Sequence, residues 1–260
     1  MKKTNLKISL FLGFIAFISG FFVVPYQMEV ISEELVEEIL ESIPFSMNVL
    51  TLVSSLQLFV IAFVLSFLGL KLARKTSFSI KILDAIFEKR KVHVDRKSLL
   101  TSIISGVVLG LIIIGSDRFY FQNLISMLAE NPPEFSVLAL LAGIFYGGVV
   151  EEILLRLFLM SLIVWICMKI FKFDKDNIFK GVYWMAIILT SVIFAAGHLP
   201  VTEMMFGELT SPLLLRAFLL NGIGGLIFGY LYWKKGFEYA VISHAFAHIS
   251  MQLLFIPMFF

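Results

Sequence analysis

Seven ionisable side chains lie inside long apolar segments of this sequence, where a charge is costly. They are Glu151, Glu152, Arg156, His198, Arg216, His244 and His248. A charged side chain at the centre of a bilayer costs roughly 2.5–3.5 kcal/mol, and such residues usually face a partner or a polar cavity. Imidazoles and carboxylates act as general bases and acids near neutral pH, and they also bind divalent metals. This grouping predicts a site that performs chemistry.

Two of these residues, Glu152 and Arg156, stand four positions apart in one segment. In a helix this spacing, with the acid first, favours an ion pair on one face. A scaffold ion pair therefore explains Glu152. It leaves Glu151, about 100° further round the helix, without a partner, and Glu151 is the carboxylate that we predict to take part in chemistry.

Three histidines lie in the same apolar part of the chain. His244 and His248 have the separation of the two histidines in the zinc motif H-E-x-x-H, but Ala245 occupies the position of its glutamate. Any carboxylate must therefore come from another helix. A single histidine among apolar residues is commonly a satisfied polar contact. Three of them on two helices, together with an unpaired Glu151, favour a catalytic or metal-binding role.

The order and spacing of these residues resemble a known family, the CAAX prenyl endopeptidases and bacteriocin-immunity proteins (CPBP intramembrane proteases). The resemblance covers roughly residues 140–255, and the segments that carry it are Glu151-Glu152-x-x-x-Arg156, Phe194-x-x-x-His198 and His244-x-x-x-His248. It implies that Glu151 activates water. It also implies that Glu152 and Arg156 orient this carboxylate, and that His198 and His244 hold or polarise the water and the substrate carbonyl.

The last motif departs from the family pattern, which usually ends in an asparagine thought to stabilise the oxyanion. Here the position is His248, and an imidazole N–H can also donate to an oxyanion. The same substitution extends the candidate ligands for a divalent metal such as zinc to four, namely Glu151, His198, His244 and His248. The sequence leaves metal dependence open.

The surrounding elements are those of a membrane protein. Of the 260 residues, 59% are hydrophobic and 15% are charged, against about 45–50% and 25% in ordinary soluble domains. We predict an all-α, polytopic transmembrane helix bundle of about seven spans. Their predicted bounds are 8–26, 48–70, 99–116, 136–171, 182–199, 212–233 and 239–259. The single cysteine, Cys167, excludes a disulfide within the chain.

The basic residues gather in the segments that this model places on one side. Residues 1–7, 71–97, 169–180 and 234–235 hold all but three of the 21 Lys and Arg residues. The segments on the other side are mainly acidic. By the positive-inside rule, we expect a multi-pass protein of the plasma membrane with its N-terminus in the cytoplasm and its C-terminus outside.

We treat residues 1–260 as one transmembrane domain, in which 1–135 are family-variable spans and 136–260 carry the motifs. Segment 136–172 would be about 55 Å long as a helix, against a hydrocarbon core of about 30 Å. It must tilt, protrude or break, with Gly147-Gly148 as its weak point. Spaced glycine pairs at 106/110, 143/147 and 225/229 predict close helix packing. Segment 71–97 is expected to be a basic loop or an amphipathic helix, and 29–41 a short surface helix.

The candidate site residues are predicted to lie at different depths along their helices. Counted from the basic ends of their segments, His198 and Glu151 lie about 27–30 Å away, whereas His244 lies only a few residues beyond Lys235. A common site requires that the turn before His244 be recessed, or that the helices tilt strongly.

Three functions are compatible with these residues. The favoured one is an intramembrane endopeptidase that acts on a peptide or protein substrate, either prenylated or otherwise membrane-anchored, within the lipid bilayer. The alternatives are a non-enzymatic bacteriocin-immunity or partner-binding protein, and a proton-coupled transporter, which the motif order disfavours. We expect no nucleic-acid partner.

Overall fold

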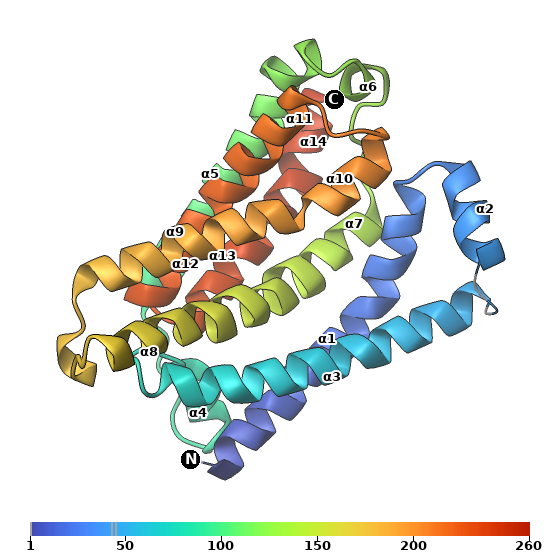
Figure 1. Cartoon of the computed structure of the whole chain (residues 1–260). Helices are drawn as coiled ribbons and strands as arrows, with labels where there is room; N and C mark the ends of the chain where they lie inside the picture. Colours follow the sequence, from blue (N-terminus) through green and yellow to red (C-terminus); the bar gives the residue numbers. More distant parts are fainter. Residues whose placement is uncertain (1, 43, 45) are drawn as a thin grey trace.

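In the part of the chain that the structure describes, seven helical segments are long and apolar enough to cross a membrane, and they form one bundle (Figure 1). The computed structural model describes residues 2–42, 44 and 46–260, and no strand occurs among them. The spans are Lys2–Glu29, Met47–Ala73, Arg96–Asn123, Val137–Ile170, Lys180–Phe206, Ser211–Lys234 and Phe237–Phe259. Each overlaps one predicted segment, and the fourth, predicted as 136–171, is one residue shorter at each end. The predicted all-α fold and the number of spans are confirmed.

Several spans are built from more than one helical stretch. The first three spans contain α1 (Lys2–Glu29), α3 (Met47–Ala73) and α5 (Arg96–Phe119), with α2 (Glu33–Ser42), α4 (Lys81–Phe87), η1 (Phe121–Asn123) and α6 (Ser126–Glu130) at their ends. The fourth span comprises α7 (Val137–Ala142), η2 (Gly143–Glu151), η3 (Ile153–Met160) and α8 (Ser161–Ile170), and is followed by η4 (Lys175–Asn177). The last three comprise α9 (Lys180–Gly197) with α10 (Leu199–Phe206), then α11 (Ser211–Arg216), η5 (Ala217–Asn221) and α12 (Gly222–Lys234), and finally α13 (Phe237–Ser250), η6 (Met251–Phe255) and α14 (Ile256–Phe259).

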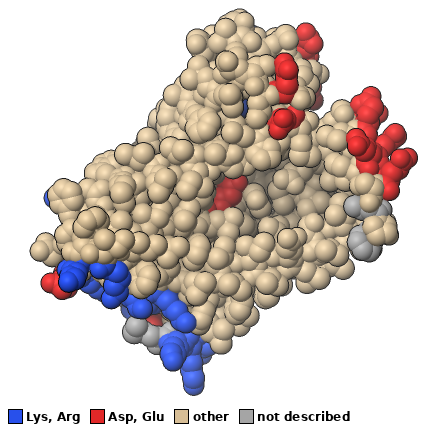
Figure 2. Space-filling view, in the orientation of Figure 1, with Lys and Arg blue, Asp and Glu red and all other residues tan. Residues whose placement is uncertain are grey.

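The surface has the polarity that a bilayer requires. Large apolar side chains are exposed along the spans, including Phe14, Val60, Leu100 and Ile188, each more than half exposed. Figure 2 shows this apolar surface between two charged ends, with Lys and Arg gathered at one end and Asp and Glu mainly at the other. The two termini lie at opposite ends of the bundle (Figure 1), as an odd number of spans requires.

The two predicted surface segments fold differently. Helix α2, on the acidic side, buries no residue, as expected for a short surface helix. Segment 71–97 contains α4, but Phe78 and Ile80 just before this helix are 6% and 3% exposed and belong to the main core. This segment is therefore packed against the bundle rather than lying free as a basic loop.

The fourth span remains one continuous helix, and it does not break at Gly147-Gly148. From Gly143 to Met160 it is almost entirely π-helical, with the wider i→i+5 hydrogen-bond pattern. Such stretches are rare and are frequent at functional sites. This one carries Glu151, Glu152 and Arg156.

The glycine pairs allow the neighbouring helices to approach closely, as predicted. A Cβ atom added at any of these glycines would touch or clash with the opposing helix. The pairs and their partners are Gly106/Gly110 of α5 against α13, Gly143/Gly147 of η2 against His248 of α13, and Gly225/Gly229 of α12 against α9.

The turn between α12 and α13 is recessed into the bundle. This explains how His244 can lie at the same depth as Glu151, although it is close to the basic end in sequence. Helix α8 and the start of α9 extend beyond this turn (Figure 1), and the segment before α4 covers it. The Phe237 backbone N–H donates to the Ser79 carbonyl at 2.9 Å, and the Glu238 carboxylate accepts from the Ile82 and Leu83 N–H groups. His244, two turns further along α13, is thereby brought level with Glu151.

Candidate active site

Glu152 is the central residue of a buried polar cluster. Its side chain is fully buried, and its Oε1 atom accepts a hydrogen bond from His244 Nδ1 at 2.9 Å. The same oxygen lies 3.1 Å from Arg156 Nη1, on the same helix. The predicted Glu152–Arg156 ion pair is therefore present, and the carboxylate has a second partner that sequence spacing does not indicate.

Arg156 is fully buried as well, and its charge is compensated from several directions. Its Nη2 atom donates to the Gly225 carbonyl of α12 at 3.2 Å. The guanidinium lies 4.9 Å from the ring centroid of Phe194 and 5.3 Å from that of Phe228. Aromatic faces stabilise a desolvated cation. Arg156 thus links the fourth, fifth and sixth spans.

His244 connects the two adjacent glutamates. A carboxylate only accepts hydrogen bonds, so the bond to Glu152 places the proton of a neutral His244 ring on Nδ1. Its Nε2 atom then carries a lone pair and lies 3.7 Å from Glu151 Oε2. The ring of Phe228 stacks on the imidazole at a centroid distance of 4.3 Å. Because the ring is packed on one face and hydrogen-bonded at one edge, its orientation is fixed.

Glu151 is the less enclosed of the two glutamates. Its side chain is 16% exposed, whereas that of Glu152 is 0% exposed. Figure 2 shows one acidic patch in a hollow of the apolar face, between the charged ends of the bundle. A carboxylate at this depth that is both partly accessible and close to an imidazole is placed to act on a water molecule or a substrate.

His198, at the end of α9, reaches the cluster through Phe194. The Phe194 ring contacts both imidazoles edge to face, at 4.8 Å from His198 and 5.8 Å from His244. His198 Nδ1 lies 2.8 Å from the Phe194 carbonyl. A carbonyl oxygen can only accept, so Nδ1 carries the proton and Nε2 of the neutral ring is left as an acceptor.

His248 stacks beside His244, with ring centroids 5.2 Å apart. A Cβ atom at Gly147 would lie 2.7 Å from His248 Nε2 and 3.4 Å from His244 Nε2, so this glycine leaves room for both rings. Within the described part of the chain, neither ring nitrogen of His248 has a hydrogen-bond partner. His248 can therefore donate one N–H to another molecule.

Of the seven predicted ionisable residues, six converge on this cluster and one does not. Arg216 forms a separate bidentate ion pair, with two contacts of 2.6 Å to Asp117 of α5. No spacing signal links two residues so far apart in the sequence. This ion pair connects α11 to α5.

The four candidate metal ligands do not converge in the way that a metal ion requires. Among residues 2–42, 44 and 46–260, no group of three or more His, Cys, Asp or Glu side chains could hold a metal ion. His244 Nδ1 bonds to Glu152 and His198 Nδ1 bonds to a backbone carbonyl, so Nε2 of each neutral ring keeps its lone pair. In this arrangement, however, the described side chains of the four candidates do not form a zinc site.

The fold and the site define a multi-pass membrane protein with a buried Glu–His–Arg cluster. Residues 133–250 match the family model described as type II CAAX prenyl endopeptidase Rce1-like. This region contains every motif residue, and the match confirms the resemblance drawn from the motifs. This part of the chain is therefore similar to CAAX-type intramembrane proteases. No curated protein and no solved structure matches the chain.

Proposed function

We propose that this protein is an intramembrane endopeptidase that hydrolyses a peptide bond with Glu151 as general base. The observation that carries the proposal is the position of His244 between the two glutamates, 2.9 Å from Glu152 and 3.7 Å from Glu151. Glu152 and Arg156 hold the His244 ring, and His244 and Glu151 face the reacting water.

The distance between Glu151 Oε2 and His244 Nε2 suits one shared water molecule. Two acceptors 3.7 Å apart can each receive one O–H of a water at normal hydrogen-bond length. Glu151 removes one proton as the water oxygen bonds to the substrate carbonyl carbon. The tetrahedral intermediate collapses with cleavage of the C–N bond, and the proton held by Glu151 passes to the leaving amine.

His198 and His248 have different proposed roles because their ring nitrogens differ in which are free to bind. His198 Nε2 is an acceptor in the neutral ring, so we assign it to a substrate N–H. His248 has an N–H to donate, and we assign it to the carbonyl oxygen that becomes the oxyanion. It thereby takes the place of the asparagine usual in the family that the motifs resemble.

The proposed substrate is a membrane-anchored peptide or protein, prenylated near its C-terminus as the name of the matched family model suggests. This assignment is supported by the position of Glu151, which lies inside the fourth membrane span and is partly exposed. A lipid anchor would hold the peptide at the bilayer, next to that surface.

The test is a peptidase assay with the reconstituted protein and fluorescent membrane-anchored peptides, with and without a prenyl group. Glu151→Gln should abolish cleavage, whereas Glu130→Gln, which changes an exposed acid of α6, should leave it unchanged. Wild-type activity in Glu151→Gln would overturn the proposal. A biological role that survives this substitution would instead support the non-enzymatic partner-binding alternative.

A further inference from the structure

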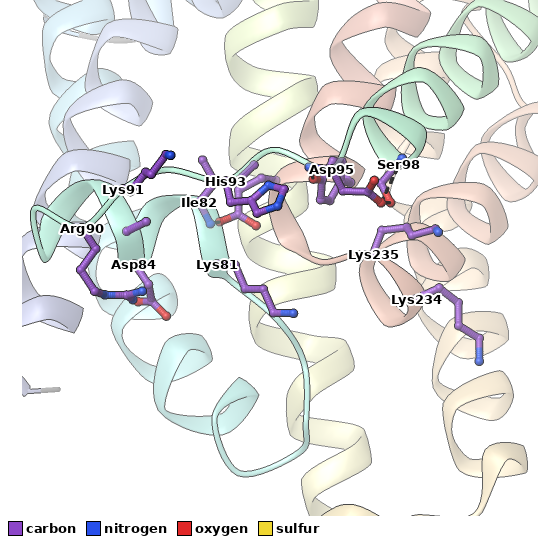
Figure 3. Close-up of a pocket in the computed structure, with 13 residues that line it drawn as sticks. Lys81, Ile82, Asp84, Arg90, Lys91, His93, Asp95, Ser98, Lys234 and Lys235 are labelled. Carbon is purple, nitrogen blue, oxygen red and sulfur yellow. Dashed lines mark hydrogen bonds between the residues drawn. The ribbon is translucent and has the colours of Figure 1, made fainter.

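A cavity lies at the basic end of the bundle, away from the Glu–His cluster. It has a volume of about 620 Å³ and is formed by α4, the segment that follows it, the start of α5 and the α12–α13 turn (Figure 3). Its polar lining residues are Lys81, Asp84, Arg90, Lys91, His93, Asp95, Ser98, Lys234, Lys235, Glu238 and Tyr239. Ligand pockets are commonly about 300–1,000 Å³, so this cavity is large enough for a small polar group.

Each of the three acids that line the cavity already has protein partners. Asp84 forms a bidentate pair with Arg74, at 2.9 and 2.6 Å. Glu238 accepts from two backbone N–H groups at the start of α4.

Asp95 caps α5 by accepting from the Lys97 and Ser98 N–H groups. The hydrogen bond from the Ser98 hydroxyl, with those N–H groups, holds the pKa of Asp95 below its usual value. The three carboxylates are therefore occupied in fixing α4, α5 and α13.

The cations around the same cavity are largely without acidic partners. Arg90 pairs with Glu88. By contrast, Lys81, Lys91, Lys234 and Lys235 form no salt bridge with any residue that the structure describes. Figure 3 shows Lys81 extending toward the turn that carries Lys234 and Lys235. Like charges grouped around one concave site repel each other and attract an anion.

Apolar side chains are exposed beside these lysines. Ile86 of α4 is 50% exposed, and Val92 and Val94 of the next segment are 42% and 37% exposed. Lys234 lies over the ring of Trp233, 3.4 Å from its centroid, and Trp is typical of the membrane interface. An anion presented here by a lipid would meet both the lysines and these apolar contacts.

We propose that this cavity binds a phosphate group presented by an anionic phospholipid, with Lys81 and Lys235 as its main contacts. The apolar side chains beside the cavity favour the lipid over free phosphate as its source. Because α13 begins at this cavity and carries His244 and His248, the bound lipid also stabilises the helix that presents the site. The proposal does not depend on proteolysis.

The test is native mass spectrometry of the purified full chain in neutral detergent, titrated with phosphatidylglycerol or phosphatidylcholine. Wild type should bind phosphatidylglycerol more tightly. Lys81→Gln/Lys235→Gln should weaken that binding roughly tenfold or more, since each Lys near a surface contributes appreciably to the binding of an anionic lipid. Lys169→Gln/Lys180→Gln, which removes two exposed lysines at the same end outside the cavity, should bind like wild type.

Equal loss of affinity in both double variants would overturn the proposal, because the effect would then come from net charge alone. Inorganic phosphate at millimolar concentration should not displace the lipid. If it binds alone with the same dependence on Lys81 and Lys235, the assignment to a lipid is wrong. Should the first double variant fail to fold, Lys91→Gln with Lys89→Gln as its control makes the same comparison.

Discussion

At the residue scale, the two adjacent glutamates lie in different environments. Glu152 is fully buried between a guanidinium and an imidazole, and Glu151 is partly exposed next to the other edge of that imidazole. A buried carboxylate held by two partners is costly to disturb, whereas its neighbour can exchange protons. In the proposed mechanism, Glu152 is the positioning carboxylate and Glu151 is the reactive one.

Glu152→Gln should destabilise the protein by about 3–5 kcal/mol, because Arg156 would keep its buried charge without a counter-charge. Glu151→Gln should change the free energy of unfolding by less than about 1 kcal/mol, because this side chain is partly exposed and outside the Arg156 ion pair. Unfolding of the purified variants in detergent, followed by circular dichroism, measures both effects.

Arg156→Ala is the complementary test of this division of work. It should resemble Glu152→Gln in stability and also lower peptidase activity, because His244 would lose a fixed partner. If Arg156→Ala is silent in both measurements, the assigned roles of the two glutamates are wrong.

His248→Asn tests the proposed oxyanion donor. A neutral imidazole and an amide each offer an N–H donor, whereas an alanine side chain offers none. His248→Asn should therefore keep much of the activity, and His248→Ala should lower it roughly 100-fold or more. Peptidase assays, with elemental analysis of the wild type and both variants, provide the measurement.

Two other results of that experiment have different meanings. Loss of both bound metal and activity would identify His248 as a metal ligand, because an amide is a poor substitute for imidazole at zinc. Unchanged activity of both variants, with no bound metal, would show that His248 only packs against Gly143 and Gly147.

At the scale of the helices, the site depends on how closely α13 approaches its neighbours. Helix α13 carries both His244 and His248, and it contacts α5 through Gly106 and Gly110. On its other side it meets the π-helical stretch that bears the two glutamates. A shift of α13 would therefore separate the imidazoles from the carboxylates.

Gly106→Ala should lower both stability and activity. The added methyl group would clash with the Ser243 carbonyl and lie 2.9 Å from the Ala247 N atom. Backbone atoms cannot rotate away as a side chain can, so α13 must move, at a cost of about 1–3 kcal/mol.

Gly115→Ala is a matched control on the same helix, since a Cβ atom there meets nothing within 4 Å. This change should be neutral or stabilise the helix by about 0.5–1 kcal/mol. Equal destabilisation by both changes would contradict the role given to close packing at Gly106. Thermal unfolding and peptidase rates measured on the two variants give the comparison.

From the sequence, the positions of the helices were easier to predict than the contacts between site residues on different helices. Apolar runs define each span, and the i,i+4 spacing predicts the Glu152–Arg156 pair. The bond from His244 to Glu152 has no such signal, because it joins different helices and depends on the recessed α12–α13 turn. That recess is produced by contacts of Ser79 and Ile82 with the start of α13, which sequence periodicity does not encode.

At the scale of the whole molecule, charge is separated along the axis of the bundle. Figure 2 shows the basic and acidic ends on either side of an apolar belt. The candidate lipid cavity belongs to the basic end, and α2 with its glutamates lies on the acidic side. Basic residues are retained in the cytoplasm during insertion. This separation of charge therefore predicts the orientation of the protein, and the apolar belt predicts how deeply the bundle lies in the bilayer.

Cysteine labelling tests that orientation directly. Ser32 and Ser77 are both exposed and lie on opposite sides of the apolar belt, and the native Cys167 is buried. In a Cys167→Ala background, an impermeant maleimide added to intact cells should label Ser32→Cys. Ser77→Cys should react only after the membrane is permeabilised. Labelling of both positions from the same side would refute the seven-span topology, and a complete exchange of the two results would keep the spans but reverse the predicted orientation. The background without either new cysteine should remain unlabelled throughout, because its only thiol has been removed.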